Sequence, residues 1–320
     1  MLALPGACGS FAAIGAEQKP GALRRRALGR TGLEVSERGF GGAGIGGNSF
    51  GAVSEADALD ALAAAQEHGC NFVDTARIYG ASELILGKFL RGRRHRWIVA
   101  TKYSGQKAGM RATLEEQLER LQTDAVDLYQ IHWVPKGNDG ALYDELYSLR
   151  REGKARFVGV SASTGGDIDY VLAHTQIDTV QLPFSLLEPE PMLGCLARLR
   201  EAGLGVIARS VLREGFLTGK FSAQRSFDPK TDVRSELKPE EQARRLSAVA
   251  KLRFLSEYDP SLASCAIRYA LSFNGISTAI IGTKTREQAD DNFLSRTGGT
   301  LPDAALSRIA AIQRLPRSVD

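Results

Sequence analysis

The chain contains Val126-Asp-Leu-Tyr-Gln-Ile-His132, a short apolar run that ends in an imidazole, and two earlier runs also end in an ionisable group. These are Asn71-Phe-Val-Asp74 and Trp97-Ile-Val-Ala-Thr-Lys102. Burying such groups at the end of a strand is costly unless they have partners. In a barrel of consecutive parallel strands the C-terminal ends lie side by side, so the three groups would meet at one mouth. Tyr79 can join them from the loop that follows Asp74.

Eight strand-like runs alternate with helix-like stretches along the chain. Such alternation indicates a parallel sheet with right-handed crossovers, and eight is the number of strands that closes a (β/α)8 barrel. The sequence therefore predicts an α/β fold of the TIM-barrel class. Ahead of the barrel, Arg26-Ala-Leu-Gly-Arg-Thr-Gly-Leu-Glu-Val-Ser36 predicts a two-stranded hairpin. Besides the three runs above, the predicted barrel strands are residues 39–42, 155–160, 179–182, 204–208 and 276–281.

Three helix starts are marked by capping sequences, in which a hydroxyl precedes a helix-like stretch and a polar side chain follows three residues later. They are Ser54-Glu-Ala-Asp57, Thr113-Leu-Glu-Glu116 and Thr285-Arg-Glu-Gln288. We expect a helix to begin at each. The polar interval from Phe221 to Arg245 is longer than a usual connection, so it predicts a functional loop.

The composition supports one folded domain. The 320 residues are 43% hydrophobic and 24% charged, which provides enough apolar surface for a full core. A (β/α)8 barrel occupies about 250 residues or somewhat more, so we assign residues 25–320 to a single barrel domain. Residues 1–24 are small and apolar and lack the basic start of a secretory signal, so we expect a flexible extension.

Charge and cysteine usage argue against several classes of protein. The formal net charge is +4, from 41 basic and 37 acidic residues, and no basic stripe favours nucleic acid as a partner. No apolar run approaches the roughly 20 residues of a membrane span. The four cysteines are scattered, which argues against a metal site or a disulfide framework. We expect a cytoplasmic protein with reduced thiols, either a monomer or a weak homo-oligomer.

The four clustered groups suit the reduction of an aldehyde or ketone. A phenol keeps its proton at neutral pH, and a neighbouring ammonium stabilises the phenolate that remains once the proton has left. Tyr79 would then be the general acid that protonates a developing alkoxide, while Asp74 keeps Lys102 charged and oriented. His132 could donate a hydrogen bond to the same oxygen. The hydride has to come from a cofactor.

A dinucleotide would bind at the same mouth. The glycines of residues 39–47 lack the strand–turn–helix context of a Rossmann motif. Gly282-Thr-Lys-Thr285 instead follows the last strand-like run and leads into a capped helix. It offers a phosphate free backbone N–H groups, a helix dipole and a lysine, at a place where TIM barrels often bind phosphate.

Several stretches of the chain resemble the aldo-keto reductases, and the resemblance extends from Leu28 to Asn292. It implies a (β/α)8 barrel whose bottom is covered by the N-terminal hairpin, together with a bound NADP(H). It also implies a catalytic tetrad of Asp74, Tyr79, Lys102 and His132. The stretches that carry it are Phe72-Val-Asp-Thr-Ala-Arg-Ile-Tyr-Gly80, Ala100-Thr-Lys102, Asp127-Leu-Tyr-Gln-Ile-His132, Gly215-Phe-Leu-Thr-Gly-Lys220 and Ile281-Gly-Thr-Lys284.

The resemblance further implies which residues hold the cofactor. Arg209 stands where many members have a tyrosine stacked on the nicotinamide, and a guanidinium can also stack on a ring. Ala162 stands where many have an asparagine, which removes one contact to the carboxamide. Lys284 near the 2′-phosphate favours NADPH, with NAD(H) as the alternative. The matching positions are Gly42 and Ala43 at the nicotinamide ribose, Ser161 and Gln181 at the carboxamide, Arg209 at the ring, Ser210, Leu212 and Lys220 at the pyrophosphate, and Gly282, Thr283, Lys284, Gln288 and Asn292 at the adenosine end.

Trp133 is expected to line the substrate pocket, although an aromatic residue packed beneath a loop is the alternative. The leading function is an NADPH-dependent carbonyl reductase, or, in reverse, a dehydrogenase of a sugar or secondary alcohol. A second class is a carbon–carbon lyase in which Lys102 forms a Schiff base. A third is a regulatory subunit that holds the cofactor with little turnover, as some channel-associated members of the family do.

Overall fold

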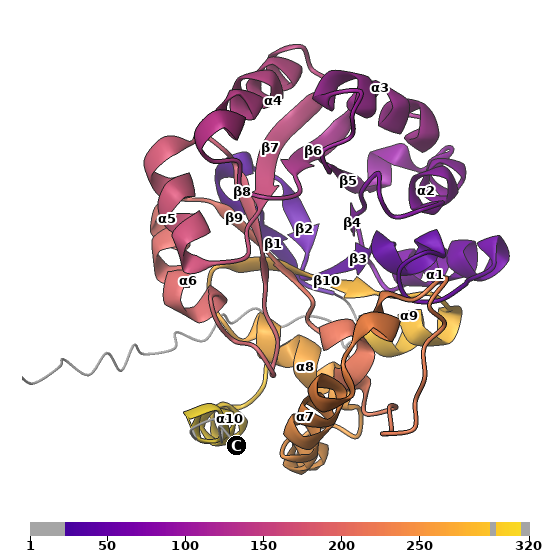
Figure 1. Cartoon of the computed structure of the whole chain (residues 1–320), viewed down its shortest axis with the longest axis vertical. Helices are drawn as coiled ribbons and strands as arrows, with labels where there is room; N and C mark the ends of the chain where they lie inside the picture. The colour runs from indigo at the N-terminus through magenta and orange to yellow at the C-terminus, as the bar shows by residue number, and fades with distance from the viewer. Residues whose placement is uncertain (1–22, 295–298, 315–320) are drawn as a thin grey trace, which may run out of the picture.

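Eight parallel strands close into a barrel surrounded by helices (Figure 1), which confirms the predicted fold. The computed structural model describes residues 23–294 and 299–314, so the predicted extension at residues 1–24 lies almost wholly outside the described residues. The last strand pairs with the first barrel strand and closes the ring. In order around the barrel, the strands are β10 (Ile276–Gly282), β3 (Arg38–Gly41), β4 (Phe72–Asp74), β5 (Ile98–Tyr103), β6 (Val126–Ile131), β7 (Ala155–Ser161), β8 (Thr179–Pro183) and β9 (Gly205–Arg209).

Two of the three predicted helix caps are confirmed. Ser54 Oγ accepts a hydrogen bond from the Asp57 N–H at 3.0 Å, and Thr285 Oγ1 accepts one from the Gln288 N–H at 3.4 Å. The third is wrong, because its helix begins at Met110 and Thr113 lies inside the first turn, donating to the Gly109 carbonyl at 2.6 Å. The helices are α1 (Glu55–Glu67), α2 (Ser82–Leu90), α3 (Met110–Leu121), α4 (Ala141–Arg151), α5 (Gly165–His174), α6 (Met192–Glu201), α7 (Pro239–Ala250), α8 (Leu262–Leu271), α9 (Arg286–Phe293) and α10 (Asp303–Arg314).

The predicted loop from Phe221 to Arg245 is only partly a loop, because α7 begins at Pro239 inside it. A proline suits the first turn of a helix, where its missing N–H is not needed. The preceding segment lies against the loop that follows β3. The Val233 N–H donates to the Ser49 carbonyl at 3.0 Å, and Phe50 forms a β-bridge with Asp232.

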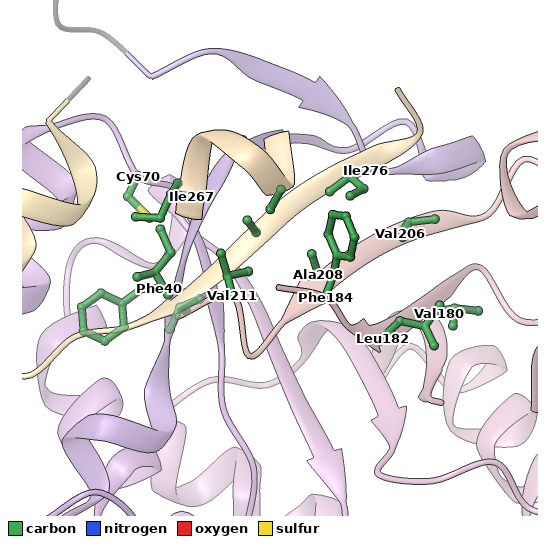
Figure 2. Packing of buried hydrophobic residues seen from close by; sticks show 14 of the residues in the cluster. Phe40, Cys70, Val180, Leu182, Phe184, Val206, Ala208, Val211, Ile267 and Ile276 are labelled. Carbon is green, nitrogen blue, oxygen red and sulfur yellow. The ribbon is translucent and has the colours of Figure 1, made fainter. Parts of the chain in front are cut away.

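The core has two layers, because successive side chains of a strand point to opposite faces of the sheet. On β9, Val206 and Ala208 face the surrounding helices, whereas Ile207 points into the barrel. Figure 2 shows part of the outer layer, where Ile267 from α8 packs near the strands. The packing in this layer holds the strands in place, and it therefore also positions the side chains at the ends of the strands.

The N-terminal hairpin closes one end of the barrel. It consists of β1 (Arg25–Ala27) and β2 (Glu34–Ser36), which pair antiparallel. Leu28, Leu33 and Val35 of the hairpin are buried in the same cluster as the inward-facing side chains of the strands.

Close approach at Gly29 fixes how the hairpin is seated. Its φ is +54°, and a Cβ there would lie 2.2 Å from the backbone nitrogen of Gly205 at the start of β9. The hairpin therefore lies at the N-terminal ends of the strands, which leaves their C-terminal ends as the open mouth.

Three cysteines lie within the described residues, and all are buried free thiols. Burial raises the pKa of Cys70 and of Cys265 to about 11, and it also raises the pKa of Cys195. Among the described residues there is no cluster of side chains suited to a metal ion, and no helix long and apolar enough to cross a bilayer.

Candidate active site

The four residues of the predicted tetrad lie at the C-terminal mouth of the barrel. Asp74 is the last residue of β4, Lys102 lies one residue before the end of β5, and His132 directly follows β6. Tyr79 lies in the loop between β4 and α2. Neighbouring parallel strands therefore bring together side chains that are up to 58 positions apart in the sequence, Asp74 and His132 being the outermost pair.

Asp74 and Lys102 form a buried ion pair. Their side chains are 2% and 0% exposed, and the Lys102 ammonium hydrogen-bonds the Asp74 carboxylate and the Thr75 carbonyl, the latter at 2.9 Å. The second carboxylate oxygen of Asp74 accepts from Gln130 Nε2 at 2.9 Å and from Gln181 Nε2 at 3.0 Å. Such a buried pair is stable only when the remaining hydrogen-bonding capacity is met, and here both amides meet it.

Tyr79 and His132 form the outer part of the cluster. The Tyr79 hydroxyl lies 3.3 Å from Nε2 of His132, and the two rings meet edge to face with centroids 5.8 Å apart. The Lys102 ammonium lies 5.3 Å from the centre of the Tyr79 ring. The phenol thus has a cation beneath it and an imidazole beside it.

His132 is neutral at physiological pH. Burial, and then the charges of Lys102 and Arg209, lower the pKa of His132 to about 3. Its Nδ1 lies 2.8 Å from Ser104 Oγ, a contact that the sequence analysis missed. The period-two alternation of a strand, continued from Lys102, would have placed Ser104 on the same face.

A buried polar network lies behind the tetrad and joins α2, α3, β5 and β6. It consists of Glu83, Thr101, Gln117, Arg120 and Tyr129, and we call it the Glu83 network. The Glu83 carboxylate, 1% exposed, accepts from Thr101 Oγ1 at 2.8 Å, from Gln117 Nε2 at 2.7 Å and from Arg120 Nε at 3.1 Å. The Tyr129 hydroxyl donates to Gln117 Oε1 at 3.0 Å.

Two bonds of the Glu83 network reach the backbone of the tetrad. Arg120 Nη2 donates at 2.7 Å to the carbonyl of Gly80, the residue after Tyr79. Gln117 Nε2 donates at 3.0 Å to the carbonyl of Lys102. The network therefore holds the loop that carries the phenol and the strand that carries the ammonium against one common set of side chains.

The positions matched to cofactor binding surround the same mouth, with the exposed Lys220 lying farthest along the loop that follows β9. Their burial differs, since Ser161, Gln181, Thr283 and Asn292 are buried and Gly282 is exposed. Gly42 and Ala43 follow β3, Ser161 ends β7, Gln181 lies in β8, Arg209 ends β9, Ser210 and Leu212 follow it, Gly282 ends β10, Thr283 and Lys284 follow it, and Gln288 and Asn292 lie in α9.

The segment after β10 is held to α9 by side-chain hydrogen bonds. The Lys284 N–H donates to Gln288 Oε1 at 2.9 Å, and Asn292 Nδ2 donates to Thr283 Oγ1 at 3.0 Å. The segment after β3 packs directly on it, because a Cβ at Gly44 would lie 3.2 Å from Lys284 Cγ. Gly44 thus allows two backbone segments to approach closely beside a helix N-terminus.

Lys284 lies in a cationic environment. Its ammonium donates to the Phe50 carbonyl at 3.0 Å. Burial, and then the charges of Arg234 and Arg225, lower the pKa of Lys284, while Asp232 acts in the opposite direction. Lys284, Arg234 and Arg225 together carry more positive charge than Asp232 neutralises, which favours the binding of an anion here.

Arg209 spans the ends of three strands. Its Nη2 donates to the Ala162 carbonyl at 3.2 Å and to Ser163 Oγ at 3.1 Å. Its Nε is buried and has no hydrogen-bond partner within the described part of the chain. Burial lowers the pKa of Arg209, and Tyr79 and Asp74 oppose that shift. A buried donor without an acceptor at the mouth fits a bound polar group.

Trp133 is half-buried beside Tyr103, with ring centroids 5.9 Å apart. The two rings form one wall of a cavity of about 410 Å³ between the loops that follow β5 and β6. Polar side chains of Asn138, Asp139 and Glu145 also line it. Trp133 follows His132 directly in the sequence, but none of the four tetrad residues lines this cavity.

A family model described as the aldo/keto reductase family matches residues 39–314. The chain is 32% identical over 295 residues to an L-galactose dehydrogenase of Arabidopsis thaliana, covering 86% of this chain and 88% of that protein. It is also 32% identical over 285 residues to aldo-keto reductase YhdN of Bacillus subtilis (strain 168), covering 81% of this chain and 85% of that protein.

Solved structures agree with the fold. The glycerol dehydrogenase AKR11B4 from Gluconobacter oxydans superimposes with a TM-score of 0.77 at 26% identity, covering 92% of this chain and 97% of that chain. The holo form of aldo-keto reductase AKR11C1 from Bacillus halodurans gives a TM-score of 0.74 at 24% identity, covering 91% of this chain and 96% of that chain.

Proposed function

Because the chain belongs to the aldo/keto reductase family, we propose that it is an NADPH-dependent enzyme that reduces an aldehyde or ketone to an alcohol, or runs the reverse oxidation. The observation that carries this proposal is the Tyr79–His132 pair next to the buried Lys102–Asp74 pair at the barrel mouth. Protonation of a developing alkoxide needs a general acid, a nearby cation and a hydrogen-bond donor.

The residues around the mouth fit a nicotinamide dinucleotide. The open Nε of Arg209 and the amide and hydroxyl side chains of Gln181 and Ser161 would hold the nicotinamide end, and Lys284 with the N-terminus of α9 would hold the phosphate of the adenosine end. When bound, the reduced nicotinamide supplies a hydride to a carbonyl carbon. The remaining catalytic work falls to this chain's own side chains.

Tyr79 gives its hydroxyl proton to the oxygen that becomes an alkoxide. The Lys102 ammonium, 5.3 Å from the ring centre, stabilises the phenolate left behind. Asp74 keeps Lys102 charged in a buried position, and Gln130 and Gln181 keep Asp74 in place. In the oxidising direction the same phenolate takes the proton back.

His132 orients the substrate rather than acting as the acid. An imidazole whose pKa is about 3 is not protonated to imidazolium at neutral pH, so it does not serve as the general acid. As a neutral ring it can still donate one hydrogen bond to the carbonyl oxygen. That bond fixes the oxygen within reach of the Tyr79 hydroxyl.

The alternative functions are less well supported. A Schiff-base lyase needs a neutral amine, whereas the Lys102 ammonium is bonded to Asp74 and Thr75. A regulatory subunit with little turnover has no need of a complete tetrad.

NADPH oxidation over aromatic aldehydes, diketones and aldoses tests the proposal. In Tyr79→Phe we expect turnover to fall by about 100-fold or more, since a positioned general acid contributes about that much. Tyr143→Phe is the matched control, because its buried hydroxyl has no hydrogen-bond partner among the described residues. Full activity of Tyr79→Phe would remove Tyr79 as the proton donor.

Cofactor choice is tested by comparing the Kd of NADPH with that of NADH. The cationic surroundings of Lys284 support a preference for the additional phosphate. We expect Lys284→Ala to weaken NADPH binding by about tenfold, the loss of one charge-assisted contact, and to leave NADH binding nearly unchanged. An equal effect on both dinucleotides would exclude Lys284 from the phosphate site.

A further inference from the structure

His132 lies between two hydroxyl groups. Its Nε2 is 3.3 Å from the Tyr79 hydroxyl, on the side of the mouth. Its Nδ1 is 2.8 Å from Ser104 Oγ, on the side of the loop that follows β5. The proposed mechanism assigns a role to the first contact and none to the second.

A neutral imidazole carries a single N–H, so the partner of one nitrogen determines what the other can do. If Ser104 donates to Nδ1, the proton is on Nε2, which then acts as a donor at the mouth. If Ser104 accepts from Nδ1–H, then Nε2 is an acceptor and takes the Tyr79 O–H. In the second arrangement the phenol's proton is committed to the imidazole before the substrate arrives.

The backbone places Ser104 for this contact. The His132 N–H donates to the Tyr103 carbonyl at 2.9 Å, so the residues after β5 and β6 stay side by side. The Ser104 N–H donates to Gln106 Oε1 at 3.0 Å, which holds the start of the loop. The hydroxyl is therefore presented to Nδ1 by a backbone fixed at both sides.

We propose that Ser104 is a positioning residue whose hydroxyl donates to Nδ1 of His132 and so holds the imidazole in its Nε2–H form. This tautomer presents an N–H to the carbonyl oxygen of a substrate and leaves the Tyr79 proton free for transfer. The catalytic meaning rests on the proposed carbonyl reduction, but the tautomer is a property of the resting protein.

Nitrogen NMR of protein labelled with 15N-histidine reads the tautomer directly, because protonated and unprotonated ring nitrogens resonate far apart. The sequence has 4 histidines, so a His132→Gln spectrum identifies the His132 signals. For the wild type at neutral pH we expect a protonated Nε2 and an unprotonated Nδ1. Ser104→Ala should shift His132 to a mixture of tautomers, and Ser104→Thr should restore the Nε2–H form.

Kinetics supply the second readout. We expect kcat of Ser104→Ala to fall by about tenfold, less than the loss of a complete oxyanion donor, with KM for NADPH nearly unchanged. Ser104→Thr should recover most of kcat. Ser148→Ala is the matched control, because it removes a hydroxyl of α4 that bonds Glu152 and makes no contact with His132.

The outcomes separate this proposal from the proposed function. If the wild type reduces no carbonyl, the proposed function is overturned. If the same protein shows the Nε2–H form of His132, and Ser104→Ala loses that form, the tautomer assignment is still supported. A protonated Nδ1 in the wild type overturns the proposal. So does a Ser104→Ala spectrum identical to that of the wild type, or a Ser148→Ala variant that reproduces every effect of Ser104→Ala.

Discussion

Asp74 and Lys102 show how strongly the site depends on single residues. Their pair is buried, and every bond that stabilises the Lys102 charge comes from the protein. Removing one partner of such a pair leaves an uncompensated buried charge, whereas removing both leaves only neutral polar groups around the space.

The pair predicts a characteristic double-mutant result. Asp74→Asn should lower the free energy of unfolding by about 3–5 kcal/mol, because Lys102 stays charged and buried without a counter-ion. Asp74→Asn/Lys102→Met should recover a large part of that stability but none of the activity. Urea denaturation of the wild type and the variants measures this, and a double variant no more stable than Asp74→Asn would contradict it.

His132 predicts how stability changes with pH. Its pKa is about 3 in the folded protein and about 6.5 in an unfolded chain, so between these values the unfolded state binds the additional proton. The contribution of His132 to stability is therefore complete above about pH 6.5 and is lost as the pH falls towards 3, by at most roughly 1.4 kcal/mol per pH unit.

Unfolding free energies of His132→Gln between pH 7 and pH 4 check this expectation. The variant should lose stability on acidification less steeply than the wild type, because it lacks the buried imidazole. His95→Gln, at an exposed position, is the control and should keep the wild-type slope. Parallel slopes for the wild type and His132→Gln would contradict the depressed pKa of His132.

At this scale the sequence predicted the ionisable members of the site and missed their partners. Asp74, Lys102 and His132 are conspicuous because a charge at a strand end needs a reason. Gln130, Glu83 and Ser104 are not conspicuous, because amides, capping acids and hydroxyls are common at such positions. For Gln130, it is the strand register, which pairs it with Lys102, that reveals its place beside the cluster.

Among the elements, α2 and α3 determine the geometry of the mouth through the Glu83 network. Because Arg120 holds the Gly80 carbonyl, its loss should displace the loop that carries Tyr79. In Arg120→Met we expect the free energy of unfolding to fall by about 2–3 kcal/mol and kcat to fall by about tenfold. KM for NADPH should stay nearly unchanged. Denaturation and steady-state kinetics measure the two effects.

Arg156→Met is the control variant for Arg120→Met. It removes an ion pair with Asp127 at 2.6 Å, which involves no tetrad residue. Its kcat should equal that of the wild type. An equal loss of kcat in both variants would mean that the Glu83 network has only a general stabilising role.

Element boundaries were predicted well where a cap made its own hydrogen bond and poorly where tertiary packing decided. Ser54 and Thr285 make their bonds to the N–H three residues on. Thr113 has the same sequence signature, but α3 begins earlier, at Met110, and its N-cap is Gly109, whose φ of +85° suits glycine. The first seven residues of α7 lie inside the predicted loop, and no apolar stripe marked the start of the helix at Pro239.

In the molecule as a whole, the hairpin that stabilises the barrel covers its N-terminal end, and the candidate active site lies at its C-terminal end. Leu28 is fully buried where the hairpin closes the N-terminal end. Leu28→Ala should lower the free energy of unfolding by about 2–5 kcal/mol through the cavity it creates, with kcat unchanged. Leu84→Ala, at a side chain 44% exposed, should change stability by less than about 0.5 kcal/mol. A loss of kcat in Leu28→Ala at a temperature where it stays folded would contradict this separation.

The burial of the thiols bears on which compounds the enzyme can tolerate. Aldehydes conjugated to a double bond alkylate thiolates, and a thiolate is the reactive form of cysteine. Cys70, Cys195 and Cys265 are out of reach of such reagents, and their raised pKa values keep them protonated. Within residues 23–294 and 299–314 we therefore expect no cysteine to react with such a reagent. Prolonged exposure of the folded protein to an enal should leave these three cysteines unmodified by mass spectrometry, and adducts on any of the three would contradict this.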